Sequence, residues 1–189
     1  MTTEKHPLQP FLPANARVLM LGSFPPPQTR WCMDFFYPNW NNDMWRIWGY
    51  LASGDKNHFV IPSEKRFDKE KIEQFCQLHG IALYDTAIEV VRLKNNASDN
   101  FLQIVSPTNV AELLRRIPQC HTIVTTGQKA AEALQTATGC APLTVGEYLP
   151  ARYADREVTL WRMPSSSRAY PRPVEWKAEY YRKIWEKLI

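Results

Sequence analysis

Short apolar segments alternate with amphipathic segments along the chain, and this alternation constrains the fold more than any other feature. Four segments have the length and apolar content of buried strands, namely residues 17–21, 81–84, 122–125 and 158–161. Apolar residues recur at helical spacing at residues 42–52, 68–78, 110–117, 128–138 and from Pro173 to the C-terminus. Such alternation is typical of a parallel sheet with helices on both faces. The sequence therefore predicts an α/β fold, a three-layer α/β/α sandwich around a central, mainly parallel four-stranded sheet.

The remaining segments show weaker patterns. The Pro-rich lead, residues 1–16, is expected to pack loosely, and the aromatic segment 31–40 is expected to form a loop. Residues 91–107 are polar and are expected to be irregular, while residues 143–155 carry no clear pattern. Since no repeat, low-complexity tract or linker interrupts the chain, residues 1–189 are predicted to form a single domain.

Length and composition suit one globular domain. The chain has 189 residues, of which 44% are hydrophobic, and this is enough to bury a core of its own. No apolar run approaches the roughly 18 residues that span a bilayer, and the first residues have no apolar signal-peptide core. We therefore expect a cytoplasmic monomer that does not bind membranes.

The four cysteines give no sign of a metal site. Cys32, Cys76, Cys120 and Cys140 are too far apart in sequence to form a clamp of the CxxC type, and no histidine cluster accompanies them. Buried thiols explain them better. The sequence thus predicts a protein without a metal or other cofactor.

Basic residues gather toward the C-terminus. Residues 1–149 contain as many acidic as basic side chains, whereas residues 150–189 contain nine basic and five acidic ones, so the net charge of +4 lies in the last forty residues. This asymmetry indicates a surface that faces a polyanion, although basic solvated helices are also common.

Three loops follow the carboxyl ends of predicted strands: residues 22–27, 85–100 and 163–170. The carboxyl ends of parallel strands lie at one edge of a sheet, where open α/β proteins bind their ligands. We therefore expect these loops to line one cleft.

The first loop allows two interpretations. Its Gly-Ser-Phe-Pro sequence is ordinary turn chemistry and could simply end a strand. Alternatively, Gly22 permits a close backbone approach, Ser23 donates a hydrogen bond to a ligand, and Pro25 to Pro27 form a rigid wall without N–H donors.

The segment from Phe35 to Asn42 is rich in aromatic and amide side chains. Consecutive aromatic rings on a loop provide stacking faces for a planar ligand such as a nucleobase. An Asn side chain supplies both a donor and an acceptor. An aromatic cluster under a loop, with Asn41 or Asn42 as a helix cap, explains the same residues equally well.

The last loop combines hydroxyl groups with a positive charge. Ser165, Ser166 and Ser167 precede Arg168, and Tyr170 follows. Short hydroxyl side chains beside an arginine suit contacts to phosphate groups, which position a duplex without reading its sequence. A Ser-Ser cap and a surface arginine are the alternative.

Taken together, these segments resemble the uracil-DNA glycosylase superfamily, most closely its hypoxanthine-DNA and mismatch-specific branches. Residues 21–26, Leu-Gly-Ser-Phe-Pro-Pro, resemble a first motif in which Gly-x-x-Pro-Gly follows a strand. Residues 163–169, Met-Pro-Ser-Ser-Ser-Arg-Ala, resemble the second motif, Leu-Pro-Ser-Thr-Ser-Pro-Ala. Between them, Gly80 to Asp85 is similar to Gly-Ile-x-Leu-Trp-Asp, and Gly127 to Ala130 is similar to Gly-x-Lys-Ala.

The resemblance implies a monofunctional DNA glycosylase, a hydrolase of base excision repair whose partner is DNA with a deaminated or mismatched base. Such enzymes flip the target nucleotide into a pocket. Asn42 would hold the attacking water, with Ser23 as a second catalytic candidate. The base would contact Gly22, Phe24, Pro25, Phe35, Tyr37, Asp85 and Asn100, and the DNA would contact Ser165, Ser166, Ser167, Arg168 and Tyr170.

The chain also departs from the family pattern. Ser23 stands where several branches have Asp or Asn, Pro26 replaces the last glycine of the first motif, and the second motif lacks a histidine. Two alternatives therefore remain beside a glycosylase. One is a catalytically inactive member that binds DNA or a free base, and the other is an unrelated doubly wound enzyme, whose Gly-rich phosphate loop is missing from the sequence.

Overall fold

A computed structural model describes residues 2–93 and 99–189, and its centre is a five-stranded sheet. Four of the strands are parallel neighbours: β5 (Ile81–Asp85), β2 (Val18–Gly22), β8 (Thr122–Thr126) and β10 (Arg156–Met163). The fifth, β9 (Tyr148–Tyr153), pairs antiparallel with β10 at the edge. The predicted sandwich and its four parallel strands are confirmed, and β9 is added. Its residues alternate between exposed and half-buried, which leaves little apolar signal in residues 143–155.

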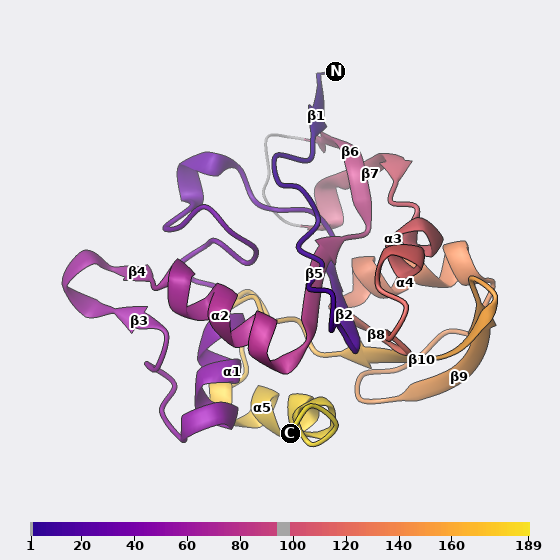
Figure 1. Ribbon diagram of the computed structural model, residues 1–189. Helices are drawn as coiled ribbons and strands as arrows, with labels where there is room; N and C mark the ends of the chain where they lie inside the picture. Colours follow the sequence, from indigo (N-terminus) through magenta and orange to yellow (C-terminus); the bar gives the residue numbers. More distant parts are fainter. Residues whose placement is uncertain (1, 94–98) are drawn as a thin grey trace.

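Helices cover both faces of this sheet, as Figure 1 shows. One face carries α1 (Met44–Ser53), α2 (Lys69–His79) and α5 (Val174–Trp185), and the other carries α3 (Val110–Arg116) and α4 (Gln128–Thr138). The ring of Trp48 contacts Phe75, Tyr181 and Trp185, and so joins the three helices of the first face. Gly80 ends α2 with a left-handed φ of 67°, as its position in the sequence predicts.

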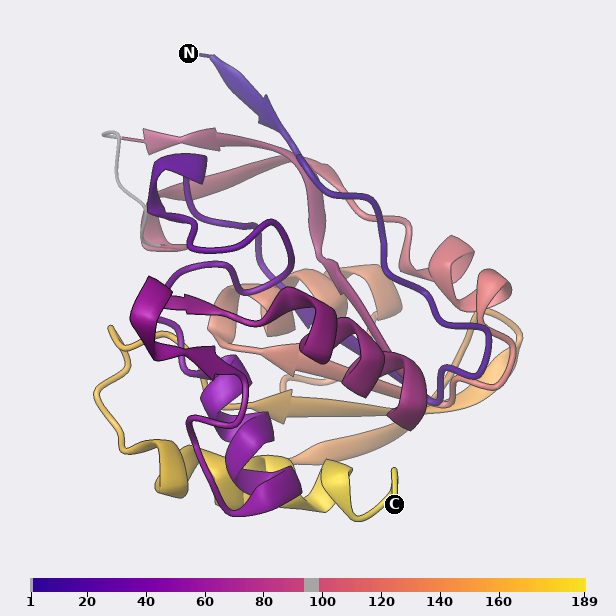
Figure 2. The ribbon, with the colours of Figure 1, turned by 60° about the vertical axis from the view of Figure 1, so that its left-hand side comes forward.

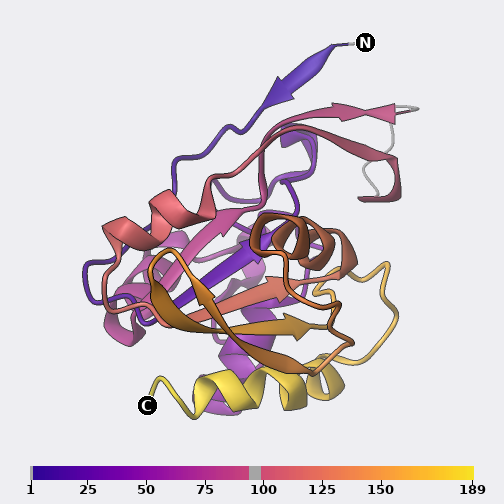
Figure 3. The same cartoon turned by 90° about the vertical axis from the view of Figure 1, so that its right-hand side faces the viewer.

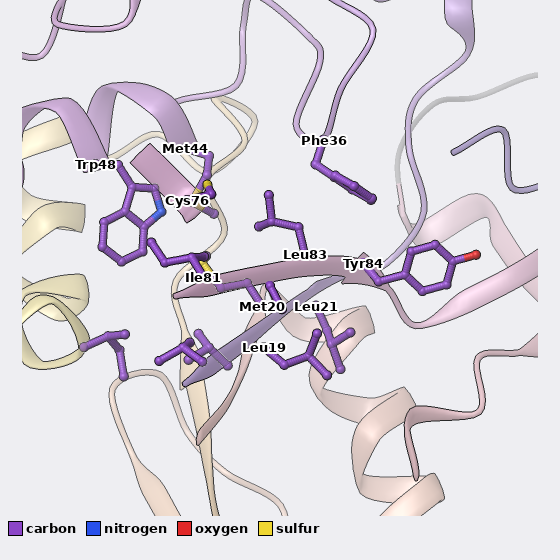
Figure 4. Close-up of a cluster of buried hydrophobic side chains, with 14 of the residues drawn as sticks. Leu19, Met20, Leu21, Phe36, Met44, Trp48, Cys76, Ile81, Leu83 and Tyr84 are labelled. Carbon is purple, nitrogen blue, oxygen red and sulfur yellow. The ribbon is translucent and has the colours of Figure 1, made fainter. Parts of the chain in front are cut away.

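Side chains on both faces of the parallel strands fill the core. Figure 4 shows Ile81 and Leu83 directed toward Trp48 and Cys76, with Leu19 and Leu21 on the opposite side. Every residue of β2 and of β5 is buried. A strand covered on both faces has apolar residues throughout rather than at alternate positions, which is the pattern expected in a parallel sheet.

A second sheet corrects two expectations. The strand β1 (Thr3–Lys5) pairs antiparallel with β6 (Ala87–Arg92), which pairs antiparallel with β7 (Leu102–Pro107). Figure 3 shows this three-stranded sheet extending beyond the central one. The prediction that residues 91–107 are irregular is therefore wrong for β7. The prediction of a loosely packed lead is also wrong, because Phe11 exchanges backbone hydrogen bonds of 3.0 and 2.9 Å with Leu83.

The remaining elements are short. They are the pair β3 (Val60–Ile61) and β4 (Arg66–Phe67) and the 3₁₀ helices at Gln28–Arg30, Pro62–Glu64 and Asp99–Phe101. The aromatic segment 31–40 contains no helix, as expected. None of the helices in the described part of the chain is long and apolar enough to cross a bilayer. Figure 2 shows how α2 and α5 lie on either side of α1.

Candidate functional site

A pocket of about 470 Å³ opens at the carboxyl end of the parallel strands. It is lined by the loop after β2, by members of the segment 36–42, by Asp85, Asp99 and Thr126, and by the loop after β10. The chain leaves β2 toward α1 and leaves β8 toward α4, on opposite faces of the sheet (Figure 1). Ligands of open α/β sheets bind at such switch points. The loops after β2 and β10 meet at one cleft as predicted, whereas the predicted loop 85–100 contains the strand β6 and contributes Asp85 and Asp99 to the pocket.

Gly22 and Asp85 form one wall of the pocket. A Cβ at position 22 would collide with Oδ1 of Asp85, so only glycine fits under this carboxylate. The backbone N–H of Thr86 donates to the carbonyl of Gly22 at 2.9 Å and ties the ends of β2 and β5 together. The close approach expected at Gly22 is thus made by a side chain of the protein itself.

His6 holds the Asp85 carboxylate from behind. Its Nε2 lies 2.8 Å from Oδ2 of Asp85, and the imidazole is 2% exposed. Nδ1 lies 2.9 Å from the carbonyl oxygen of Leu8 and 3.1 Å from its backbone nitrogen, so the ring is held on both sides. Sequence reasoning missed His6, because a single histidine in a Pro-rich lead carries no pattern.

Asp99 contributes a second carboxyl group to the pocket. The hydroxyl of Ser23 donates to Oδ1 of Asp99 at 2.9 Å, and both residues line the cavity. Burial raises the pKa of Asp99, and the negative charge of Asp85 acts in the same direction, whereas the Ser23 hydrogen bond lowers it. The neighbouring Asn100 was predicted to contact the base, but its side chain lies outside the described residues.

The aromatic wall consists of Phe24, Phe36 and Tyr37. The prediction of Phe35 as a stacking residue is corrected: Phe35 does not line the pocket but packs in the core against Phe11 and Trp45. Phe36, the next residue, lines the pocket in its place.

Tyr37 crosses the floor of the pocket. Its φ of 52° is left-handed, and its hydroxyl lies 3.3 Å from Oγ1 of Thr126 at the end of β8. Burial, reinforced by the charge of Asp85, raises the pKa of Tyr37, so the phenol keeps its proton. The segment 36–37 is therefore anchored to the end of β8 through Thr126 and to α1 through Trp45, whose Nε1 donates to the carbonyl of Phe36 at 2.9 Å.

Asn39, Asn41 and Asn42 all line the pocket. The side-chain oxygen of Asn42 accepts a hydrogen bond of 2.9 Å from the backbone N–H of Met44, at the start of α1. Asn42, one residue before the N-cap Asp43, thus braces the start of α1 and lines the cavity at once. The carbonyl of this amide is held by the helix, so its NH₂ group is the part best placed to contact a ligand.

A buried ion pair fixes the serine loop beside Asn42. Asp43 donates its backbone N–H to the carbonyl of Ser166 at 2.8 Å, and its carboxylate binds Nζ of Lys177 at 3.1 Å. Lys177 also donates to the carbonyl of Ser167 at 3.0 Å. The start of α1 and the second-motif loop are therefore joined through one lysine of α5.

The hydroxyl oxygens of the serine loop already accept bonds from the backbone. Ser165 accepts from the N–H of Ser167, and Ser167 accepts from the N–H of Ala169, each at 3.2 Å. A hydroxyl that accepts one bond still has its own proton to donate. Ser165, Ser166, Ser167 and Tyr170 line the pocket, so four of the five predicted DNA contacts lie together there.

Arg168 lies in a neighbouring groove of about 530 Å³. Its Nε binds Oδ1 of Asp43 at 3.0 Å, and about half of its side chain is exposed. The same groove contains three further cationic side chains, those of Arg46, Lys56 and Arg172, and it shares Tyr170 with the pocket. A positively charged groove thus adjoins the pocket.

Most of the C-terminal basic residues have other partners. Lys177 is buried, Arg156 donates to three backbone carbonyls, and Arg152 and Arg182 pair with glutamates. Of the nine basic residues in the last forty, Arg168 and Arg172 line the groove. The overall charge asymmetry therefore overstates the size of the polyanion-facing surface.

The fold has a counterpart among solved structures. An NMR structure described as "a putative Uracil DNA glycosylase from Methanosarcina acetivorans" matches 99% of this chain with 99% of its own, with a TM-score of 0.67 and 20% sequence identity. The two proteins share a fold. No protein-family model matches the sequence, and no curated protein matches it either.

All four cysteines are free, Cys76 and Cys120 in the core and Cys32 and Cys140 half-buried. Within residues 2–93 and 99–189, no three His, Cys, Asp or Glu side chains are grouped so that they could hold a metal ion. The polar side chains of the pocket are carboxyl, amide and hydroxyl groups together with the guanidinium group of Arg30.

Proposed function

We propose that this protein is a monofunctional DNA glycosylase that hydrolyses the N-glycosidic bond of a deaminated or mismatched base. The observation that carries the proposal is the composition of one pocket: flat aromatic side chains, the amide of Asn42 and two carboxyl groups lie together beside a cationic groove. The volume of the pocket, about 470 Å³, lies within the range of roughly 300–1,000 Å³ typical of small-molecule sites. Base excision repair is the process that such an activity serves.

The target nucleotide would leave the helix and enter the pocket, which costs a few kcal/mol and costs least for a mispaired base. Phe36 and Tyr37 provide apolar surface for the ring of the base. Asp85 lines the pocket while its Oδ2 contacts His6, and carboxyl oxygens accept hydrogen bonds from a base. It therefore suits a base with a ring N–H, as deaminated purines and uracil have.

Asn42 would position the attacking water through its NH₂ group. An amide does not take a proton from water, so bond cleavage to an oxocarbenium-like sugar must lead and water capture must follow. The departing base then carries negative charge, which donors in the pocket stabilise as an oxyanion hole does. Ser165 and the phenol of Tyr37, which keeps its proton, are donors in that cavity.

The DNA backbone would lie along the serine loop and the adjoining groove. Hydroxyl groups and arginines bind phosphate oxygens without regard to sequence. Ser167 offers a hydroxyl proton, and Arg168 and Arg172 offer guanidinium groups next to Tyr170. These contacts would hold the duplex while one nucleotide occupies the pocket.

The test is excision from labelled duplexes and single strands that carry uracil, hypoxanthine, xanthine, or a G·T or G·U mismatch, followed by alkali. We expect strand cleavage at one of these lesions and no cleavage of the undamaged control. Ser23 and Pro26 in the first motif favour the alternative, an inactive member that binds DNA or a base. Salt-sensitive binding without cleavage at any lesion would support that alternative and contradict the proposal.

A further inference from the structure

Two residues far apart in sequence meet in the wall of the pocket. Ser23 follows β2, and Asp99 begins the short helix before β7, yet the hydroxyl of Ser23 donates to Oδ1 of Asp99 at 2.9 Å. Ser23 is 8% exposed, so water competes little for this bond. Ser23 is the first-motif position at which related branches place an acidic or amide residue. In this chain a hydroxyl there holds a carboxyl group that comes from another loop.

The two carboxyl groups of the pocket differ in their surroundings. Asp85 is bound to the imidazole of His6 at 2.8 Å and lies against Gly22. Among the described residues, no cationic side chain lies within ion-pair distance of Asp99. Within residues 2–93 and 99–189 its carboxyl group is thus held by the Ser23 hydroxyl and not by an ion pair.

The charged groups that face Asp99 act in opposite directions on its pKa. Burial raises the pKa most, and the charge of Asp85 adds to this effect, while Lys129 of α4 and Arg92 of β6 lower it. Arg92 is itself bound to Glu4 at 3.0 Å and to the carbonyl of Pro25. The titratable or charged groups in or beside this wall are therefore Asp85, His6, Tyr37, Arg30, Arg92, Glu4 and Lys129.

We propose, on the basis of the glycosylase activity proposed above, that Asp99 is the catalytic proton acceptor and that Ser23 positions it. The oxygen of the water forms a bond to C1′, and the C1′–N bond breaks with its electron pair left on the base. One proton of the water passes to the Asp99 carboxylate and from there to the departed base anion, so that the carboxylate is regenerated. In this scheme Asn42 orients the water, and Asp99 accepts the proton that an amide cannot accept.

The test is the single-turnover excision rate between pH 4.5 and pH 9 for the native chain, Asp99→Asn and Ser23→Ala, on the lesion duplex that the native protein cleaves best. We expect the native rate to fall on the acidic side as Asp99 becomes protonated. Asp99→Asn should lower the rate by about 10²–10⁴-fold and abolish that acidic limb. Ser23→Ala should move the limb to higher pH, because it removes the bond that favours the ionised carboxylate.

Asp34→Asn, which changes an exposed carboxylate outside the pocket, is the matched control and should behave like the native chain. Lesion-duplex affinity of Asp99→Asn within about three-fold of native would show that the loss is chemical. The assignment would be overturned if the excision rate of Asp99→Asn still fell on the acidic side. It would also be overturned if this variant lost a fall in rate at alkaline pH that the native chain shows. If the native protein cleaves no lesion, the proposed function fails and this assignment fails with it.

Discussion

The ammonium group of Lys177 lies 3.1 Å from Oδ2 of Asp43, and the two side chains are 0% and 5% exposed. A buried lysine is rare unless it is paired. Here it also donates to the carbonyl of Ser167, while Asp43 binds Arg168 through its other oxygen. One ion pair therefore fixes the start of α1, the serine loop and α5 relative to one another.

The first prediction concerns this ion pair. Lys177→Met leaves a buried carboxylate without its main partner and should lower the free energy of unfolding by roughly 3–5 kcal/mol. Asp43→Asn combined with Lys177→Met removes both charges and should recover part of that loss. Urea denaturation of the three proteins measures both effects. Equal stability of Lys177→Met and the native chain would show that the pair is not a structural tie.

Phe36 and Phe35 should respond differently to the same substitution. Phe36→Leu removes ring surface from the pocket, where stacking on a base is worth about 1–3 kcal/mol, so kcat/KM for excision should fall about ten-fold or more. Phe35→Leu changes only core packing and should cost roughly 1–2 kcal/mol of stability. Excision kinetics and thermal unfolding of both variants separate the two effects. A larger kinetic loss in Phe35→Leu would reverse this assignment.

Arg168 should act through phosphate contacts. Arg168→Ala should weaken DNA binding alike for lesion and undamaged duplexes and reduce the slope of log K against log salt by about 1. The control is Arg152→Ala, which should leave the slope unchanged. Arg152 lies on β9 and forms an exposed ion pair with Glu157 of β10. Fluorescence anisotropy titrations between 50 and 200 mM salt measure the slope, and identical slopes for the two variants would argue against a backbone contact at Arg168.

Asp99 should be a source of instability at neutral pH. Because its pKa is raised in the folded state, folding favours the protonated form, and the ionised form costs stability once the pH exceeds the unfolded-state pKa of about 3.9. Asp99→Asn should therefore raise Tm at pH 7, and the gain should shrink as the pH falls through the folded pKa toward 4. Thermal unfolding across this range, with Asp34→Asn as the control, measures the trend. A gain in Tm that grows toward acidic pH would contradict a raised pKa of Asp99 in the folded state.

Much of the fold could be predicted because periodicity reports burial directly. The four parallel strands and the helices around them stand out by their apolar residues, whereas β9 and the sheet of β1, β6 and β7 do not. In β7 only Leu102 is buried, and exposed and half-buried residues alternate after it, so the segment lacks the run of buried apolar residues that marks the central strands. The strand β6 pairs with β1, which lies more than 80 residues away in the sequence. No local pattern reveals such a pairing.

The candidate site was predictable in its loops but less so in its side chains. Gly22, Ser23, Asp85 and the serines meet as parallel strand ends require. Which of Phe35 and Phe36 faces the pocket depends on the direction of each side chain in a loop. Hydrophobic periodicity does not predict that direction. His6 and Asp99 become visible only through their partners Asp85 and Ser23, whose hydrogen bonds span 79 and 76 residues of sequence.

The central claim is that this pocket hydrolyses the glycosidic bond of a flipped base with Asn42 beside the reacting water. The hydrogen bond from the Met44 N–H must be separated from this role, because losing such a bond alone costs about 1 kcal/mol. Asn42→Ala should lose both this bond and the activity. Asn42→Ser keeps a hydroxyl acceptor for the Met44 N–H and should recover stability, but it should leave excision low, because it lacks the NH₂ group.

The most direct measurement is therefore the single-turnover release of free base from one lesion duplex by the native chain, Asn42→Ala, Asn42→Ser and the distant control Asn15→Ala, with duplex affinity measured in parallel. The account predicts release by the native chain and by Asn15→Ala, and a loss of about 10²-fold or more in both Asn42 variants at near-native affinity. Full activity in Asn42→Ser, or no release of base by the native chain from any lesion duplex, would contradict it.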